Sequence, residues 1–291
     1  MHFLPTRDQV DLQHGVREML ASVFPLERLD AGWTPSLWHR LEETGVFALR
    51  TDLGLGMVES VLVYEELGRA AVPGPVAVVD STSNPLLVPH LDVASSLLVL
   101  DGETASVVDA ADVTGELVGE PLDPLTPLTE IAALPTGVPV EGATTLRRDG
   151  ALLTAALQLG LATRMTELAV DYAKQREQFG QVIGSFQAVK HLCADMFVRA
   201  ELARAAVHSA AVTVDDAAVG DALRAVAGAK LLADEAATVN ARSCVQVHGR
   251  MGFTWEVPVH FFVRRAWVLA TEFGTADEHA EQVAECLVAS P

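Results

Sequence analysis

Apolar residues in the first part of the chain recur at the intervals of amphipathic helices. Thr6 and Gln9 have the form of a capping box at the start of the first of these helices. Thr34-Pro35 has the form of an N-cap followed by a proline in the first turn of a second helix. A third helix is expected from about Met57 to Ala71. The pattern therefore predicts a helical N-terminal domain over residues 1–75.

The pattern changes between residues 76 and 149, where prolines recur and the apolar stretches become short and rich in β-branched side chains. Ser96–Leu100 and Thr104–Val108 flank Asp101-Gly102, which is a strong β-hairpin signal. Further short strands are expected, at Glu116–Val118 and Glu130–Ala133. This segment is predicted to be a small, reduced β-domain.

Long helical patterns return in residues 150–291 and are joined by short loops. The expected helices are Ala151–Gln175, Phe186–Asp216, Gly220–His248, Val257–Thr271 and Ala276–Ala289. Long amphipathic helices with short connections predict an antiparallel helical bundle. The fold class expected for the whole chain is therefore mainly α, with a helical N-terminal domain, a reduced β-domain and a C-terminal bundle.

Net charge, the length of apolar runs and cysteine spacing exclude several classes of function. The net charge of −19, from 39 acidic and 20 basic residues, repels phosphate backbones, and no Lys/Arg-rich run offsets it, so nucleic-acid binding is not expected. No apolar run approaches the roughly 18 residues that span a bilayer, and the first residues do not have the form of an export signal. The three cysteines lack metal-ligand spacing. A cytoplasmic protein without a membrane partner or a metal site is expected.

One motif carries candidate chemistry where two of the expected helices meet. The stretch Arg176-Glu-Gln178-Phe179-Gly is followed by a turn and then by Gln187 at the start of the next helix. Arginine is a permanently charged, bidentate donor that suits a diphosphate. Gln178 and Gln187 offer donors and acceptors to a ribose or an adenine. Because a lone arginine at a helix end more commonly caps carbonyls, the assignment of Arg176 rests on the whole motif.

A second motif lies at the end of a later helix, in the stretch Gln246-Val-His-Gly249-Arg250-Met-Gly252. Glycine lets backbone N–H groups approach a phosphate because no Cβ stands in the way. His248 within the motif has no Cys or carboxylate partner at metal-ligand spacing, and a structural or surface role is expected for it.

The two motifs, in this order in a helix–β–helix chain, resemble the signature of the acyl-CoA dehydrogenases. The resemblance implies an acyl-CoA dehydrogenase-like fold, an oligomer, an FAD cofactor and an acyl-CoA substrate that is dehydrogenated between its α- and β-carbons. Electrons are then expected to pass to an electron-transfer flavoprotein. The residues implied to contact FAD across a subunit interface are Arg176, Gln178, Phe179, Gln187, Gln246 and Gly249.

The chain also departs from this family. After Leu128-Thr129-Glu130 there is no Gly-Ser-Asp segment, which in the family cradles the flavin ring, and Arg250 replaces a loop glycine. The two family positions of the catalytic base hold Phe273 and Gly150. Their neighbours Glu272 and Asp149 are weak candidates, because one residue turns a helical side chain by about 100°.

These losses resemble the non-catalytic partners in heteromeric acyl-CoA dehydrogenases, such as those that shorten steroid side chains. The chain is expected to be a shortened subunit that assembles with a homologous dehydrogenase or with itself and supplies part of an FAD site. A partner that bears its own glutamate is expected to provide the base. Two alternatives stay open at this point: a non-enzymatic scaffold, and a self-sufficient dehydrogenase with a displaced base.

Overall fold

The computed structural model describes residues 3–74, 79–80 and 86–289. The N-terminal helices are α1 (Arg7–Val23), η1 (Leu26–Ala31), α2 (Pro35–Glu43) and α3 (Met57–Arg69). The capping box at α1 is confirmed, since Thr6 N–H donates to Gln9 Oε1 at 2.8 Å and Gln9 N–H donates to Thr6 Oγ1 at 3.3 Å. The Thr34 cap is confirmed by the Leu37 N–H, which donates to Thr34 Oγ1 at 3.3 Å.

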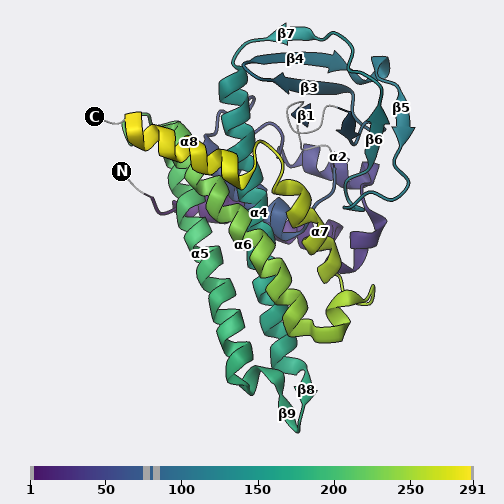
Figure 1. Ribbon diagram of the computed structural model, residues 1–291, viewed down its shortest axis with the longest axis vertical. Helices are drawn as coiled ribbons and strands as arrows, with labels where there is room; N and C mark the ends of the chain where they lie inside the picture. The colour runs from purple at the N-terminus through teal and green to yellow at the C-terminus, as the bar shows by residue number, and fades with distance from the viewer. Residues whose placement is uncertain (1–2, 75–78, 81–85, 290–291) are drawn as a thin grey trace.

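The middle of the chain forms two small sheets at one end of the molecule (Figure 1). The first has the order β1 (Val79–Asp80), β3 (Ser96–Asp101), β4 (Thr104–Asp109) and β7 (Val138–Val140). The second has the order β2 (Leu87–Pro89), β6 (Leu128–Ile131) and β5 (Gly115–Leu117). The predicted hairpin is confirmed as β3–β4, with Gly102 in the left-handed region at φ +53°. The expected strand at 130–133 begins two residues earlier than predicted.

Long helices run the length of the molecule (Figure 1). They are α4 (Ala143–Gln175), α5 (Gln187–Asp215) and α6 (Ala222–His248), followed by the shorter α7 (Val259–Leu269) and α8 (Ala276–Ala289). The hairpin β8 (Glu177–Gln178) and β9 (Gln181–Val182), with η3 (Ile183–Ser185), reverses the chain between α4 and α5. The mainly α fold with a helical bundle is confirmed.

The predicted start of the first bundle helix is wrong. The helix begins at Ala143, after Gly142 at φ +87°, and not at residue 151. The stretch from Thr144 to Asp149 is polar apart from one leucine, so it lacks the apolar repeat that reveals a helix in sequence. As a consequence, Asp149 and Gly150 lie inside α4 and not at its first residue.

Helix α3 packs on α4 at very short range because a glycine lies on each side of the contact. A Cβ placed on Gly160 would lie 2.0 Å from the Glu65 carbonyl oxygen, and one on Gly68 would lie 2.0 Å from the Leu157 carbonyl oxygen. Only glycine allows this approach of two backbones. The N-terminal helices and the C-terminal bundle also share one hydrophobic core. Leu67 of α3, Leu161 of α4 and Phe262 of α7 belong to the same buried cluster. The division into domains at residues 75 and 149 stays a prediction.

Candidate functional site

The first sequence motif lies at the end of the bundle opposite the sheets. Helix α4 ends where Arg176 leaves helical geometry, at φ −74° and ψ 124°, while its N–H still donates to the Tyr172 carbonyl at 2.8 Å. The following hairpin turns through Phe179 at φ +54° and Gly180 at φ +79°. Two consecutive left-handed residues are what a two-residue hairpin turn requires. An aromatic residue rarely occupies this region, so the backbone at Phe179 is strained.

The side chains of this motif point into solvent. Phe179 is 92% exposed and meets only the edge of Phe186, with ring centroids 6.1 Å apart, so it is not a core residue. Arg176 is exposed and has no acidic partner in the part of the chain that the structure describes. Gln178 and Gln187 are also exposed. The motif therefore presents a free guanidinium, two amides and an aromatic ring at one tip of the molecule.

The second motif reaches the same end of the bundle, where α6 meets η4 (Gly249–Phe253). Gln246 is exposed, and Gly249 has φ +59° with open space where a side chain would stand. The ring of His248 stacks on Tyr172 of α4, with ring centroids 4.2 Å apart, and joins the two motifs. Burial lowers the pKa of His248, and its Nδ1 lies 2.8 Å from the Cys244 carbonyl oxygen. His248 thus has the structural role that was expected.

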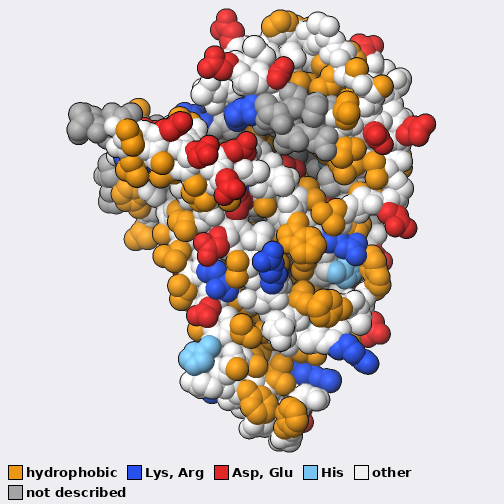
Figure 2. Space-filling model, viewed as in Figure 1, with side chains coloured by type: hydrophobic (Ala, Val, Ile, Leu, Met, Phe, Trp, Pro, Cys, Tyr) orange, Lys and Arg blue, Asp and Glu red, His pale blue; other side chains and the backbone are white. Residues whose placement is uncertain are grey.

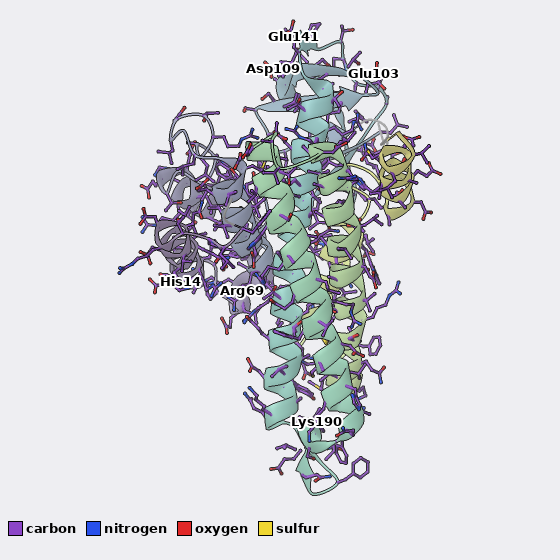
Figure 3. All side chains as sticks on the ribbon, turned by 90° about the vertical axis from the view of Figure 1, so that its left-hand side faces the viewer. His14, Arg69, Glu103, Asp109, Glu141 and Lys190 are labelled. Carbon is purple, nitrogen blue, oxygen red and sulfur yellow. The ribbon has the colours of Figure 1, made fainter. Side chains whose placement is uncertain are left out.

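Charge is unevenly distributed along the molecule. Figure 3 shows Glu103, Asp109 and Glu141 at the sheet end and Lys190 near the hairpin at the opposite end. In Figure 2, Lys and Arg side chains are gathered in the lower half of the molecule among exposed hydrophobic ones. Trp255, which follows η4, is 70% exposed, and the Arg264 guanidinium lies 5.0 Å from the centroid of its ring. In a chain of charge −19, this end is the surface best suited to an anionic group.

The two weak candidates for the base lie in the wall of one cavity of about 260 Å³ between the sheets and the helices. Asp149 belongs to α4 and Glu272 to the turn after α7, far apart in the sequence. Leucines of α4 and α7 supply much of the remaining lining, including Leu153, Leu157 and Leu269. The cavity is thus a mostly apolar chamber whose wall also contains the two carboxylates, Arg50, Arg265 and His90.

The Asp149 carboxylate is already occupied. Its Oδ2 accepts a hydrogen bond from Arg50 Nη1 at 2.6 Å, and its Oδ1 accepts from Arg148 Nη2 at 2.6 Å. Charge-assisted bonds of this length hold the group in place. Because both of its oxygens already accept hydrogen bonds from guanidinium groups, Asp149 fits a structural role better than a catalytic one.

Glu272 has the opposite environment. Burial raises the pKa of this carboxyl to about 7, although the positive charges of Arg265 and Lys230 oppose the shift. A carboxyl that titrates near neutral pH is suited to accept a proton from a bound molecule. Helix α7 ends at Leu269, and the chain turns through residues 270–273 before α8, so Glu272 is not held in a helical direction.

Phe273 follows in an unusual conformation, with φ +56°, and Gly274 has φ +106°. The Phe273 ring is buried against Gly150, where an added Cβ would lie 2.3 Å from a ring carbon. Gly150 and Phe273, the two positions at which the sequence resemblance implied a base, are therefore in direct contact, and the glycine makes room for the aromatic ring.

A buried ion pair that sequence analysis missed supports this region. Lys230 of α6 is fully buried, and its Nζ donates to the two carboxylate oxygens of Asp234 at 2.7 and 2.9 Å and to the Leu269 carbonyl at 3.3 Å. Lys230 therefore holds the end of α7, from which Glu272 departs. The i, i+4 spacing of a lysine and an aspartate in an Ala-rich helix was the available signal.

Within the described residues, no helix is long and apolar enough to cross a membrane. The same residues contain no group of three or more His, Cys, Asp and Glu side chains that could hold a metal ion.

The chain is similar to known proteins in its sequence and in its fold. Residues 143–288 match the family model described as "Acyl-CoA dehydrogenase, C-terminal domain". The chain is 34% identical to acyl-CoA dehydrogenase IpdE2 of Mycobacterium tuberculosis, over 81% of this chain and 82% of the relative. It is 30% identical to IpdE2 of Mycolicibacterium smegmatis, over 87% and 88%. Its fold is similar to a chain of the ChsE4-ChsE5 complex from Mycobacterium tuberculosis, with a TM-score of 0.82, 22% identity and full coverage of both chains.

Proposed function

Because this chain belongs to the acyl-CoA dehydrogenase family, we propose that it is one subunit of an FAD-dependent enzyme that dehydrogenates an acyl-CoA thioester between its α- and β-carbons. Its own contribution is a set of residues at the hairpin end of the bundle that bind FAD across a subunit interface. The observation that carries the proposal is the convergence of the two motifs on that end, joined by the His248–Tyr172 stack.

The residues present fit the cofactor. FAD, when bound, supplies the acceptor for the hydride that leaves the β-carbon. Arg176 would bind the diphosphate, since it is exposed and has no competing carboxylate among the described residues. Gly249 would let its backbone approach the same group, since the space beside its Cα is open. Gln178, Gln187 and Gln246 would serve the ribose and the adenine.

The exposed aromatic side chains at this end support assembly with another subunit. Phe179 is 92%, Phe253 82% and Trp255 70% exposed; Phe179 lies within the first cofactor motif, and the other two follow the second. Large exposed apolar side chains of this kind are typical of protein interfaces. We propose a homologous dehydrogenase subunit, or a second copy, as the partner, and an electron-transfer flavoprotein as the electron acceptor. The ChsE4-ChsE5 neighbour is, by its name, a complex of two proteins.

A second candidate role is favoured by Glu272. It lines a mostly apolar cavity, and burial raises its pKa to about 7. In this role the acyl group would enter the cavity of this chain, and the Glu272 carboxylate would take the α-proton. Asp149 is proposed to hold the surrounding arginines and not to act as the base, because both of its oxygens accept hydrogen bonds.

Arg176→Ala should weaken FAD binding in the assembled complex by about ten- to a hundredfold, because charge-assisted bonds to a diphosphate contribute about 1.5–3 kcal/mol. The measurement is FAD affinity by titration of the deflavinated complex, followed through flavin fluorescence. Arg7→Ala is the matched control, since Arg7 is an exposed arginine at the start of α1. Unchanged affinity in Arg176→Ala, with the fold intact, would assign Arg176 a structural role. A purified complex that never contains flavin would favour the scaffold alternative.

A further inference from the structure

We propose that the Phe273 side chain is a specificity-determining partition, which confines the acyl group of the substrate to a compact chamber beside Glu272. A second cavity lies on the other side of its ring. The inference rests on the second candidate role proposed above, in which the acyl group enters the cavity of this chain. Beyond that role, the inference specifies that the acyl group is compact and not extended, and it names Phe273 as the residue that limits the size of the acyl group.

Phe273 contributes to the walls of two cavities. One is the chamber of about 260 Å³ that holds Glu272 and Asp149. The other has a volume of about 340 Å³ and lies between the first turns of α4, the first turns of α6, and α8. Phe273 is 5% exposed and lines both cavities, from which we infer that its ring separates them. Removal of the ring would join them.

The ring is held in this position from both sides. On the α4 side, three ring atoms would lie 2.3–2.7 Å from a Cβ placed on Gly150, so only glycine at that position accommodates the ring. On the α8 side, His279 Nε2 lies 3.0 Å from the Phe273 carbonyl oxygen. A Cβ on Gly274 would lie 3.0 Å from the same His279 nitrogen. The backbone and the ring are thus both fixed by neighbouring helices.

The backbone conformation points to a functional reason for this position. Phe273 has φ +56° and Gly274 has φ +106°. An aromatic residue in the left-handed region is disfavoured and persists only where the surroundings impose it. Here the turn places the Glu272 carboxyl and the Phe273 ring in the wall of the same chamber.

The chamber defines the class of acyl group. Its volume of about 260 Å³ lies slightly below the usual range of about 300–1,000 Å³ for small-molecule sites. Its apolar lining includes Tyr64, Leu98 and Leu153. A short or compact acyl group fits these dimensions, whereas a longer one meets the Phe273 ring. The cavity behind the ring has a mainly polar wall that includes Arg148, Glu281 and Glu285.

The test compares wild type, Phe273→Ala and Phe273→Leu in the assembled complex with butyryl-, octanoyl- and dodecanoyl-CoA and an artificial electron acceptor. Phe273→Ala should raise kcat/KM for dodecanoyl-CoA relative to butyryl-CoA by at least about tenfold, because the discrimination of hydrophobic pockets per methylene is of that order. Phe273→Leu should give a smaller change in the same direction. Phe3→Ala, which removes a half-exposed ring near the N-terminus, should leave the profile unchanged.

A second measurement tests the position of the ring without any activity. Gly150→Ala should lower the thermal unfolding midpoint of the wild-type chain and should have little effect in the Phe273→Ala background, because the overlap disappears with the ring. If Gly150→Ala lowers the unfolding midpoint equally in the wild-type chain and in Phe273→Ala, the proposed packing of the ring against Gly150 is wrong. Turnover with the same size profile in wild type and Phe273→Ala would overturn this inference alone. Absence of flavin and turnover from every variant would contradict the proposed function together with it.

Discussion

Replacing Gly160 by alanine should lower the free energy of unfolding by about 4 kcal/mol or more, which is a large fraction of the roughly 5–15 kcal/mol of a typical protein. The new Cβ would lie 2.0 Å from the Glu65 carbonyl oxygen and 2.5 Å from the Arg69 nitrogen. Both are backbone atoms, so α3 and α4 must separate along their length. Separation would also pull Glu65 away from Arg204 and His208, with which its buried carboxylate pairs.

Urea unfolding followed by circular dichroism at 222 nm provides the measurement, and soluble yield serves if the variant does not fold. The matched control is Gly228→Ala in α6, where nothing lies within 4 Å of the added Cβ. That change should be neutral or stabilising by up to about 1 kcal/mol, because alanine is the better helix former. Gly68→Ala should behave like Gly160→Ala, since its Cβ would lie 2.0 Å from the Leu157 carbonyl oxygen. A loss below about 1 kcal/mol for Gly160→Ala would contradict the close packing of α3 on α4.

Features set by local chemistry were predictable from the sequence. The Thr6–Gln9 capping box, the Thr34 cap and the Asp101-Gly102 hairpin depend on a few consecutive residues, and all three are present. The long helices of the bundle were found because their apolar repeat extends over many turns. The first turns of α4 were missed because residues 144–149 are mostly polar, and their helical state depends on Ala143 and Leu146 packing against the buried core.

The candidate site was only partly predictable, because it depends on contacts between distant segments. The motif residues at the hairpin end could be named from their order in the sequence. The sequence could not show that Glu272 and Asp149 share a cavity, since Asp149 lies in α4 and Glu272 in the distant turn after α7. Nor does the sequence reveal that α7 ends at Leu269, or that Arg50 and Arg148 occupy the Asp149 carboxylate. These contacts distinguish Glu272 from Asp149 as candidates for the base, whereas the sequence alone gives no reason to prefer either.

The isolated chain should not dehydrogenate any acyl-CoA, whereas the complex with its partner subunit should. No Gly-Ser-Asp segment follows Leu128-Thr129-Glu130, which forms strand β6 here and pairs with β2 and β5. The cradle for the flavin ring must therefore come from the partner under the proposed function. The measurement is steady-state turnover with an artificial electron acceptor, for the chain alone and for the co-expressed complex. Robust turnover by the isolated chain would overturn the subunit proposal.

Under the second candidate role, in which Glu272 is the base, Glu272→Gln should lower the kcat of the complex by about 10²- to 10⁴-fold, the usual contribution of a positioned general base. The glutamine keeps the shape of the side chain and removes its ability to accept the α-proton. Because the base acts in its ionised form and burial raises the Glu272 pKa to about 7, kcat should rise with pH up to about 7 and then level off. Below that value, protonation removes the base, and kcat should fall by about tenfold for each pH unit.

Asp149→Asn is the matched control for the loss of one carboxylate from the same cavity. It leaves Arg50 and Arg148 without their shared acidic partner, so we expect a lower unfolding midpoint but a loss of kcat below about tenfold. If Glu272→Gln instead retains full turnover and the same pH profile, the base comes from the partner subunit. The Glu272 carboxyl would then be a half-buried group of this chain without a catalytic role, and the cavity beside Phe273 would not be the site of proton removal.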